Sequence, residues 1–276
     1  MKFRHIGLFI IIIAVTFNGC NGKSFGMVND SEIMPINRFD AALFQWIDSD
    51  DSTVLAELKN KYPQMLDVLG NSLFTAEYTD VSILFNYIIN YYSEPTLKSL
   101  YKDAMSFYSG NSQNTEDAIK ELSYGFMQLK QLFPSMQIPA IYMHVSGLHQ
   151  NIIVADSLLS FSIDKYLGLG YAPYEKLVNS FHQRKSMIPE RMVKDGLSGW
   201  LKSEFPYKGK DNVLLERMIY EGKIIHVLIK AGYDYNFKNI TSTTDDEYKW
   251  CLNYESTLWT TIIERKHLFT DRKSVV

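Results

Sequence analysis

Cysteine is scarce in this sequence, which has only two, Cys20 and Cys251, among 276 residues. A lipid on Cys20, which the N-terminal segment predicts below, would leave Cys251 without an intramolecular partner and would exclude an internal disulfide. Cys251 lies between Trp250 and Leu252, and these neighbours predict a buried, unreactive thiol. The fold must therefore depend on a hydrophobic core, and a chain of this length with 46% hydrophobic residues can build one.

Long apolar runs and an excess of one charge are also missing. After Cys20, no apolar stretch approaches the roughly 20 residues that a transmembrane helix requires. The formal net charge is only −3, which is too small to indicate binding to nucleic acid or to an anionic membrane surface. We therefore predict a folded body that has no nucleic-acid partner.

The N-terminus has the pattern of an export signal. A short basic start precedes the apolar segment Ile6–Phe17, which is too short to span a bilayer and is typical of a secretory signal. The segment ends at Gly19-Cys20, and a small residue before a cysteine resembles a relaxed bacterial lipobox. We predict a signal peptide over residues 1–19, with acyl chains such as palmitate on Cys20. Cleavage of an ordinary signal peptide, with an incidental cysteine, is the alternative.

The remaining sequence predicts one domain. Residues 20–36 are polar and contain glycine, so we expect a tether to the domain at 37–276. Helical periodicity dominates residues 37–135, and strand patterns followed by further helices occupy residues 136–276. We therefore predict a mostly helical α+β fold with a small antiparallel sheet. Strands are expected at 140–145, 151–155 and 158–163, and later helices at 174–181, 189–204 and from 244 onward. The last helix should face inward with Trp250, Tyr254, Leu258, Trp259 and Ile262.

The stretch Val213–Lys230 predicts the central helix of the core. Its apolar residues fall in one sector roughly 100° wide around a helix, with Gly222 in the middle. Glycine costs about 1 kcal/mol relative to alanine inside a helix, so Gly222 predicts that another backbone comes very close. Glu221 lies at the edge of the same face, and we expect it to form a buried ion pair with Arg217 or Lys223.

The order of elements is that of a zincin metallopeptidase, in which helices and a small sheet precede a core helix that carries HExxH. Here Tyr220-Glu221 stands at the position of the first two motif residues, and Ile224 replaces the second histidine. His226 lies about 140° around the helix from Glu221 and cannot join it in such a zinc site. We therefore predict a zincin-like fold with a degenerate active-site helix, no metal and no cofactor.

Six short motifs are distributed over almost the whole mature chain. They are RFD at 38–40, YP at 62–63, VSG at 145–147, DKYLG at 164–168, MIYEGK at 218–223 and WCLNYE at 250–255. Together they resemble the GldB gliding motility lipoproteins, with DKYLG and YEGK the more specific. The resemblance implies a lipid-anchored envelope protein linked to gliding and its associated secretion system, related to zincin-like domains but lacking the paired histidines. Members usually continue past residues 268–271 with a glycine- and tryptophan-containing tail, and here this chain departs from the family.

Two functional interpretations remain open. In the favoured one, the protein is a non-catalytic assembly or scaffold lipoprotein, a pseudoenzyme that is anchored in the cell envelope and faces the periplasm. Its partners would be other envelope lipoproteins or membrane proteins of the gliding and secretion machinery. In the alternative, it is a zinc-independent or degenerate zincin-like hydrolase with Glu221 as general base. Ser146-Gly147 lacks the G-x-S-x-G context of a nucleophile elbow.

Several residues are candidates for a structural or binding role. Asp164 and Tyr166 are expected to be a turn cap and a core aromatic, or to bind a ligand where a sheet edge meets a cleft. His144 and His149 bracket a strand end and could share a metal, but hydrogen bonding in the sheet or loop is favoured. The full set of structural or binding candidates is Asp164, Tyr166, Tyr220, Glu221, Gly222 and Lys223.

Overall fold

The computed structural model describes residues 32–49, 51–74, 81–210, 213–232, 243–266 and 268. The expected signal peptide, the lipidation residue Cys20 and most of the expected tether lie outside these residues. No helix in the described ranges is long and apolar enough to cross a bilayer.

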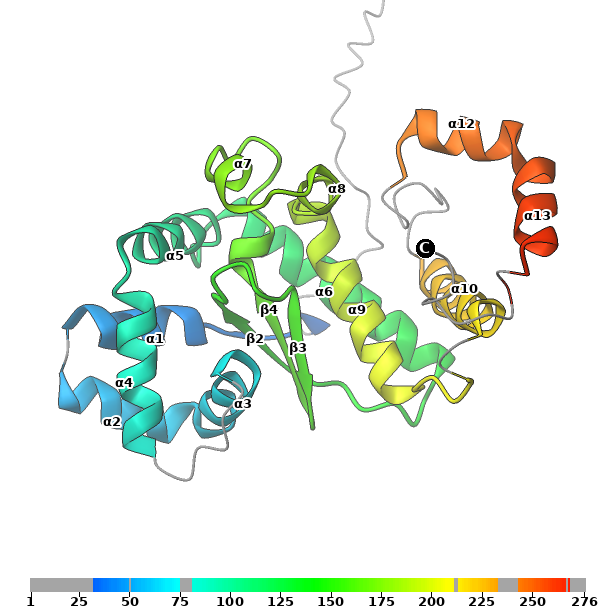
Figure 1. Cartoon of the computed structure of the whole chain (residues 1–276). Helices are drawn as coiled ribbons and strands as arrows, with labels where there is room; N and C mark the ends of the chain where they lie inside the picture. The colour runs from blue at the N-terminus through cyan, green and yellow to red at the C-terminus, as the bar shows by residue number, and fades with distance from the viewer. Residues whose placement is uncertain are drawn as a thin grey trace, which may run out of the picture.

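A four-stranded sheet lies between two layers of helices (Figure 1). The strands are β1 (Ile36–Asn37), β2 (Ala140–His144), β3 (Ile152–Ala155) and β4 (Leu158–Ser162), in the spatial order β1-β2-β4-β3. Strands β3 and β4 form the expected antiparallel hairpin, whereas β2 pairs in parallel with both β1 and β4. The prediction of an antiparallel sheet is therefore wrong, because the alternation that identifies a strand does not specify the direction of its partner.

The N-terminal helices cover one face of the sheet. Asp51 begins α2 by accepting a hydrogen bond from the Thr53 amide at 2.7 Å. Glu94 caps α5 in the same way, with Pro95 at the first helical position. The Tyr62 ring, between α2 and α3, contacts Tyr142 on β2. The helices of this layer are α1 (Phe39–Ser49), α2 (Ser52–Lys61), α3 (Pro63–Phe74), α4 (Val81–Tyr92) and α5 (Pro95–Phe107).

The opposite face of the sheet is covered by α6 (Gln113–Leu132) and α9 (Pro189–Glu204). Two glycines let α9 lie directly on the strands. A Cβ at Gly196 would come within 2.3 Å of the Phe161 ring on β4, and one at Gly199 within 2.2 Å of Ile152 on β3. The close approach that the sequence analysis assigned to Gly222 is thus made by the glycines of α9.

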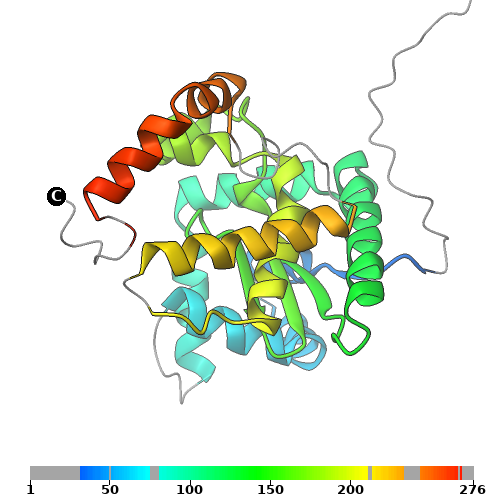
Figure 2. The same ribbon diagram turned by 90° about the vertical axis from the view of Figure 1, so that its right-hand side faces the viewer.

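Helix α10 (Leu214–Lys230) lies outside α9 and is not the central helix of the core (Figure 2). Only Ile224 and Leu228 are buried on it, and the Met218 side chain is 40% exposed. A Cβ at Gly222 would meet no atom within 4 Å, so the predicted tight packing there is wrong. An apolar face shows that a helix packs against something, but it does not show how deeply the helix lies.

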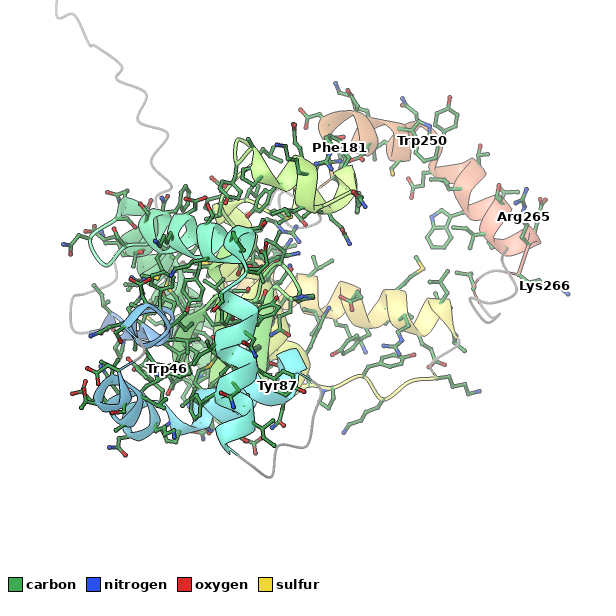
Figure 3. All side chains as sticks on the ribbon, turned by 60° about the vertical axis from the view of Figure 1, so that its left-hand side comes forward. Trp46, Tyr87, Phe181, Trp250, Arg265 and Lys266 are labelled. Carbon is green, nitrogen blue, oxygen red and sulfur yellow. The ribbon has the colours of Figure 1, made fainter. Side chains whose placement is uncertain are left out.

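Two short helices, α12 (Asp245–Asn253) and α13 (Glu255–Glu264), form what we call the C-terminal arm. A capping box of Thr244 and Glu247 is present at its start. The predicted inward face is not, because the side chains of Trp250 and Trp259 are 52% and 41% exposed. Cys251 is exposed as well, contrary to the expected buried thiol. Figure 3 shows the arm, which carries Trp250 and ends near Arg265 and Lys266, apart from the helical body.

Short elements complete the fold. The 3-10 helix η2 (Ile163–Lys165) follows β4, and the helix expected at 174–181 is replaced by α7 (Pro173–Leu177) and α8 (Phe181–Lys185). Gly232, with a φ of 85°, follows the end of α10.

Alanine substitutions at Gly196 and Gly222 should distinguish close packing at α9 from close packing at α10. Gly196→Ala should lower the free energy of unfolding by about 1–3 kcal/mol, because the buried Phe161 ring must move. Gly222→Ala should raise it by up to about 1 kcal/mol through helix propensity alone. Urea denaturation of both variants measures the difference. Destabilisation at Gly222 with tolerance at Gly196 would contradict the packing described here.

Candidate functional site

Asp164, the first residue of the DKYLG motif, is fully buried at the carboxyl ends of β2 and β4. Its Oδ1 accepts hydrogen bonds from the Ser146 amide at 3.0 Å and the Ser162 hydroxyl at 2.6 Å. Its Oδ2 accepts one from the Leu148 amide at 2.6 Å. Burial raises the pKa of the Asp164 carboxyl, although these three hydrogen bonds act in the opposite direction. One side chain thereby joins the chain leaving β2 to the chain leaving β4.

The loop that Asp164 holds has an unusual backbone. Gly147 and Leu148 both have a φ of 69°, a left-handed conformation that is costly for leucine. A Cβ at Gly147 would lie 2.2 Å from the Tyr91 hydroxyl. The VSG motif therefore needs glycine here, both for the left-handed backbone and because a side chain would collide with Tyr91. The amide of Leu148 reaches Asp164 only because of this turn, and the hydrogen bond offsets part of the strain.

Tyrosine hydroxyls satisfy the carbonyl groups of the same region. They come from α4, from α5 and the residue that follows it, and from α7. They donate to backbone oxygens that follow β2 and β4 or that lie at the start of α1. Burial, with a smaller contribution from the Asp164 charge, raises the pKa of Tyr91 to about 12. The phenols therefore stay protonated as donors. The pairs are Tyr91 to Ser146, Tyr92 to Val145, Tyr101 to Asp40, Tyr108 to Tyr166 and Tyr174 to Asp164.

Tyr166 connects this region to α9. Its ring is fully buried, and its hydroxyl donates to Asp195 Oδ2 at 3.1 Å. Asp195 is also paired with Arg191 at 3.2 Å and accepts a hydrogen bond from the Asn151 amide group at 3.2 Å. Asp164 and Tyr166 thus belong to one hydrogen-bonded network, which ties the sheet to the helices on both of its faces.

The same sheet face holds a histidine and two further serines, which raises the question of a hydrolytic triad. His144 Nδ1 lies 2.7 Å from the Ser160 hydroxyl, whereas Asp164 binds Ser162 and not His144. All of these side chains are fully buried. The arrangement separates the acid from the base and gives a substrate no access, so it does not have the geometry of nucleophilic catalysis.

Glu221 is placed differently from its predicted position. It forms an ion pair with Lys202 of α9 at 2.8 Å and is 51% exposed. The predicted buried ion pair with Arg217 or Lys223 is therefore wrong. Arg217 instead lies over the Tyr207 ring, 3.9 Å from its centroid. The partner was missed because sequence spacing reveals neighbours on one helix and not those on a helix packed beside it.

Tyr220 and Lys223 line an open groove of about 520 Å³ between α10, the end of α9 and the segment that joins them. The groove was not predicted. Its walls include Phe205, Tyr207, Lys208 and Ile219. The aromatic-rich segment Phe205-Pro206-Tyr207 was the available signal, but it becomes a wall only because α10 folds back along α9. Asp164 and Tyr166 lie in the buried network and contribute nothing to this groove.

In the part of the chain that the structure describes, no three or more His, Cys, Asp or Glu side chains are grouped so that they could hold a metal ion. His144 is occupied by Ser160, and the exposed His149 packs near the Tyr91 ring.

Comparison with known proteins identifies the family but no closer relative. The model of a family described as "Gliding motility protein GldB" matches residues 27–276, which includes both the buried network and the groove. No curated protein and no solved structure matches the chain.

The buried His144 should make the free energy of unfolding depend on pH. Burial lowers the pKa of His144 to about 3, below its usual 6.5, so the unfolded chain binds more protons between these values. The contribution of His144 to the free energy of unfolding is full above pH 6.5. It should fall as the pH drops below this value, by about 1.4 kcal/mol per pH unit. His144→Gln, which can still bond Ser160, should have a shallower pH profile in urea denaturation between pH 7 and 4.5. Parallel profiles would contradict the assignment.

Proposed function

Because the chain belongs to the GldB gliding motility family, we propose that it is a lipid-anchored, non-catalytic assembly component of the gliding and secretion machinery in the cell envelope. The signal peptide would occupy residues 1–19, and Cys20 would carry the acyl chains. The domain at 37–276 would then be held at a membrane on the periplasmic side, where it would contact other lipoproteins or membrane proteins.

The observation that carries this proposal is the exposed apolar surface of α10 and the C-terminal arm. Soluble monomers rarely expose many large apolar side chains close together, and such surfaces mark contacts with other proteins. Tryptophan and tyrosine are also the residues that contribute most to binding at such interfaces. The exposed side chains are Met218, Ile219, Trp250, Leu252, Tyr254, Trp259 and Ile263.

The geometry of Glu221 supports a non-catalytic role over the hydrolase alternative. A general base needs a partner nucleophile or water held against a substrate. Glu221 is half exposed, and its carboxylate is already paired with Lys202. The serines and the histidine next to Asp164, which are Ser146, Ser160, Ser162 and His144, are fully buried and cannot supply a nucleophile to a substrate.

Two surface variants can distinguish an assembly role from a catalytic one. Each is introduced into a gliding bacterium from which the gene for this protein has been deleted. Glu221→Gln should keep gliding and should change the free energy of unfolding by less than about 1 kcal/mol, because an exposed ion pair contributes little. The double variant Trp250→Ser/Leu252→Ser should fold but lose gliding. Spreading on agar and thermal melts measure both properties. A folded Glu221→Gln protein without gliding would instead support the hydrolase.

Replacement of the lipidated cysteine tests the anchor separately. Cys20→Ser should move the protein from the membrane fraction to the soluble fraction and abolish gliding. Cys251→Ser is the matched control, since this exposed thiol should not affect fractionation. Mass spectrometry of the mature wild-type protein should find acyl chains on Cys20. A free N-terminus at another residue would refute the anchor.

A further inference from the structure

The groove beside α10 has apolar walls formed by aromatic rings and aliphatic side chains. Phe133, from the end of α6, stacks near Phe205 with ring centroids 4.9 Å apart, and Tyr207 packs against Tyr220 at 5.3 Å. Ile219 adds an aliphatic side chain that is 50% exposed. The volume of about 520 Å³ lies within the range of small-molecule sites, which are mostly apolar with a few polar groups.

Most polar groups of the groove are already bound within the protein. The Tyr220 hydroxyl donates to the Phe205 carbonyl at 2.8 Å, and the Tyr207 hydroxyl donates to the Lys210 carbonyl at 2.7 Å. Glu216 accepts a hydrogen bond from the Lys210 amide at 2.7 Å. The groove therefore offers few donors and acceptors to the backbone of a bound peptide, which would need them.

Two lysines are the exception. Lys208 and Lys223 line the groove, and the side chain of neither forms an ion pair or hydrogen bond with another residue that the structure describes. Of the other cations nearby, Lys202 pairs with Glu221 and Arg217 lies over the Tyr207 ring. The groove thus combines apolar walls with two lysine side chains that can bind an anion, whereas its carboxylate, Glu216, is hydrogen-bonded to the Lys210 amide.

We propose that this groove binds a single-chain anionic amphiphile, with its hydrocarbon chain along the aromatic wall and its acidic head group at Lys208 and Lys223. Charge complementarity selects the head group, and the apolar walls select the chain. This binding activity goes beyond the assembly role and does not depend on it, because the arm and the membrane anchor take no part.

Three probes with the same chain and different head groups test the proposal: dodecanoate, dodecanol and dodecyltrimethylammonium, each below its micelle concentration. Calorimetric titration would use the full chain carrying Cys20→Ser, so that acyl groups on the protein do not compete. Dodecanoate should bind severalfold more tightly than dodecanol, and dodecyltrimethylammonium most weakly. Lys208→Gln and Lys223→Gln should each weaken dodecanoate binding by up to about fivefold and leave dodecanol unchanged.

Matched variants locate the site. Lys230→Gln removes a charge of the same helix that does not line the groove, and it should bind all three probes as the parent does. Ile219→Glu should weaken binding of both dodecanoate and dodecanol, because it places a charge on the apolar wall. Equal affinity for dodecanoate and dodecanol, absence of binding, or full binding by Ile219→Glu would each overturn the proposal. Binding of an acidic peptide in place of dodecanoate would overturn it as well.

Discussion

The fold depends on how the polar backbone at the ends of β2 and β4 is satisfied inside the core. A buried amide or carbonyl without a partner costs about 1–3 kcal/mol, and this region contains many of them because two parallel strands end together there. Asp164 accepts from the amides, and tyrosine hydroxyls donate to the carbonyls. Since the donors come from α4, α5 and α7, the same bonds fix those helices to the sheet. Tyr91, Tyr92, Tyr108 and Tyr174, which are four of the 18 tyrosines of this chain, therefore have a structural role here.

The packing of α9 on the other face of the sheet determines which apolar side chains are left exposed. Gly196 and Gly199 bring α9 close to the strands, so α9 occupies the core position that the sequence predicted for α10. Helix α10 must then pack outside α9, and its apolar face is only partly covered. The groove and the exposed apolar surface arise from this displacement. Residues of the YEGK motif accordingly lie on the surface, where they are available for binding.

Local chemistry could be predicted from the sequence, and the pairing of distant surfaces could not. Asp51, Pro95 and the Thr244–Glu247 capping box set helix starts through contacts within a few residues, so such positions can be recognised in the sequence itself. Depth is different. The apolar stripe of α10 and the row of aromatics on the C-terminal arm look the same in sequence whether a core or a future partner covers them. The family motifs pointed to Asp164, but its partners on β2 and β4 emerged only from the parallel register of those strands.

The C-terminal arm is attached to the rest of the protein near both of its ends. At its start, Glu247 pairs with Lys185 of α8 at 2.9 Å. Beyond its end, the Leu268 carbonyl accepts a hydrogen bond from the Leu215 amide at 3.2 Å, and neither helix of the arm has a buried residue. We expect such a segment to form a cooperative unit of low stability, which detaches while the tyrosine-linked body stays folded. Its amide protons should then exchange with solvent through this local opening, faster than those of the sheet.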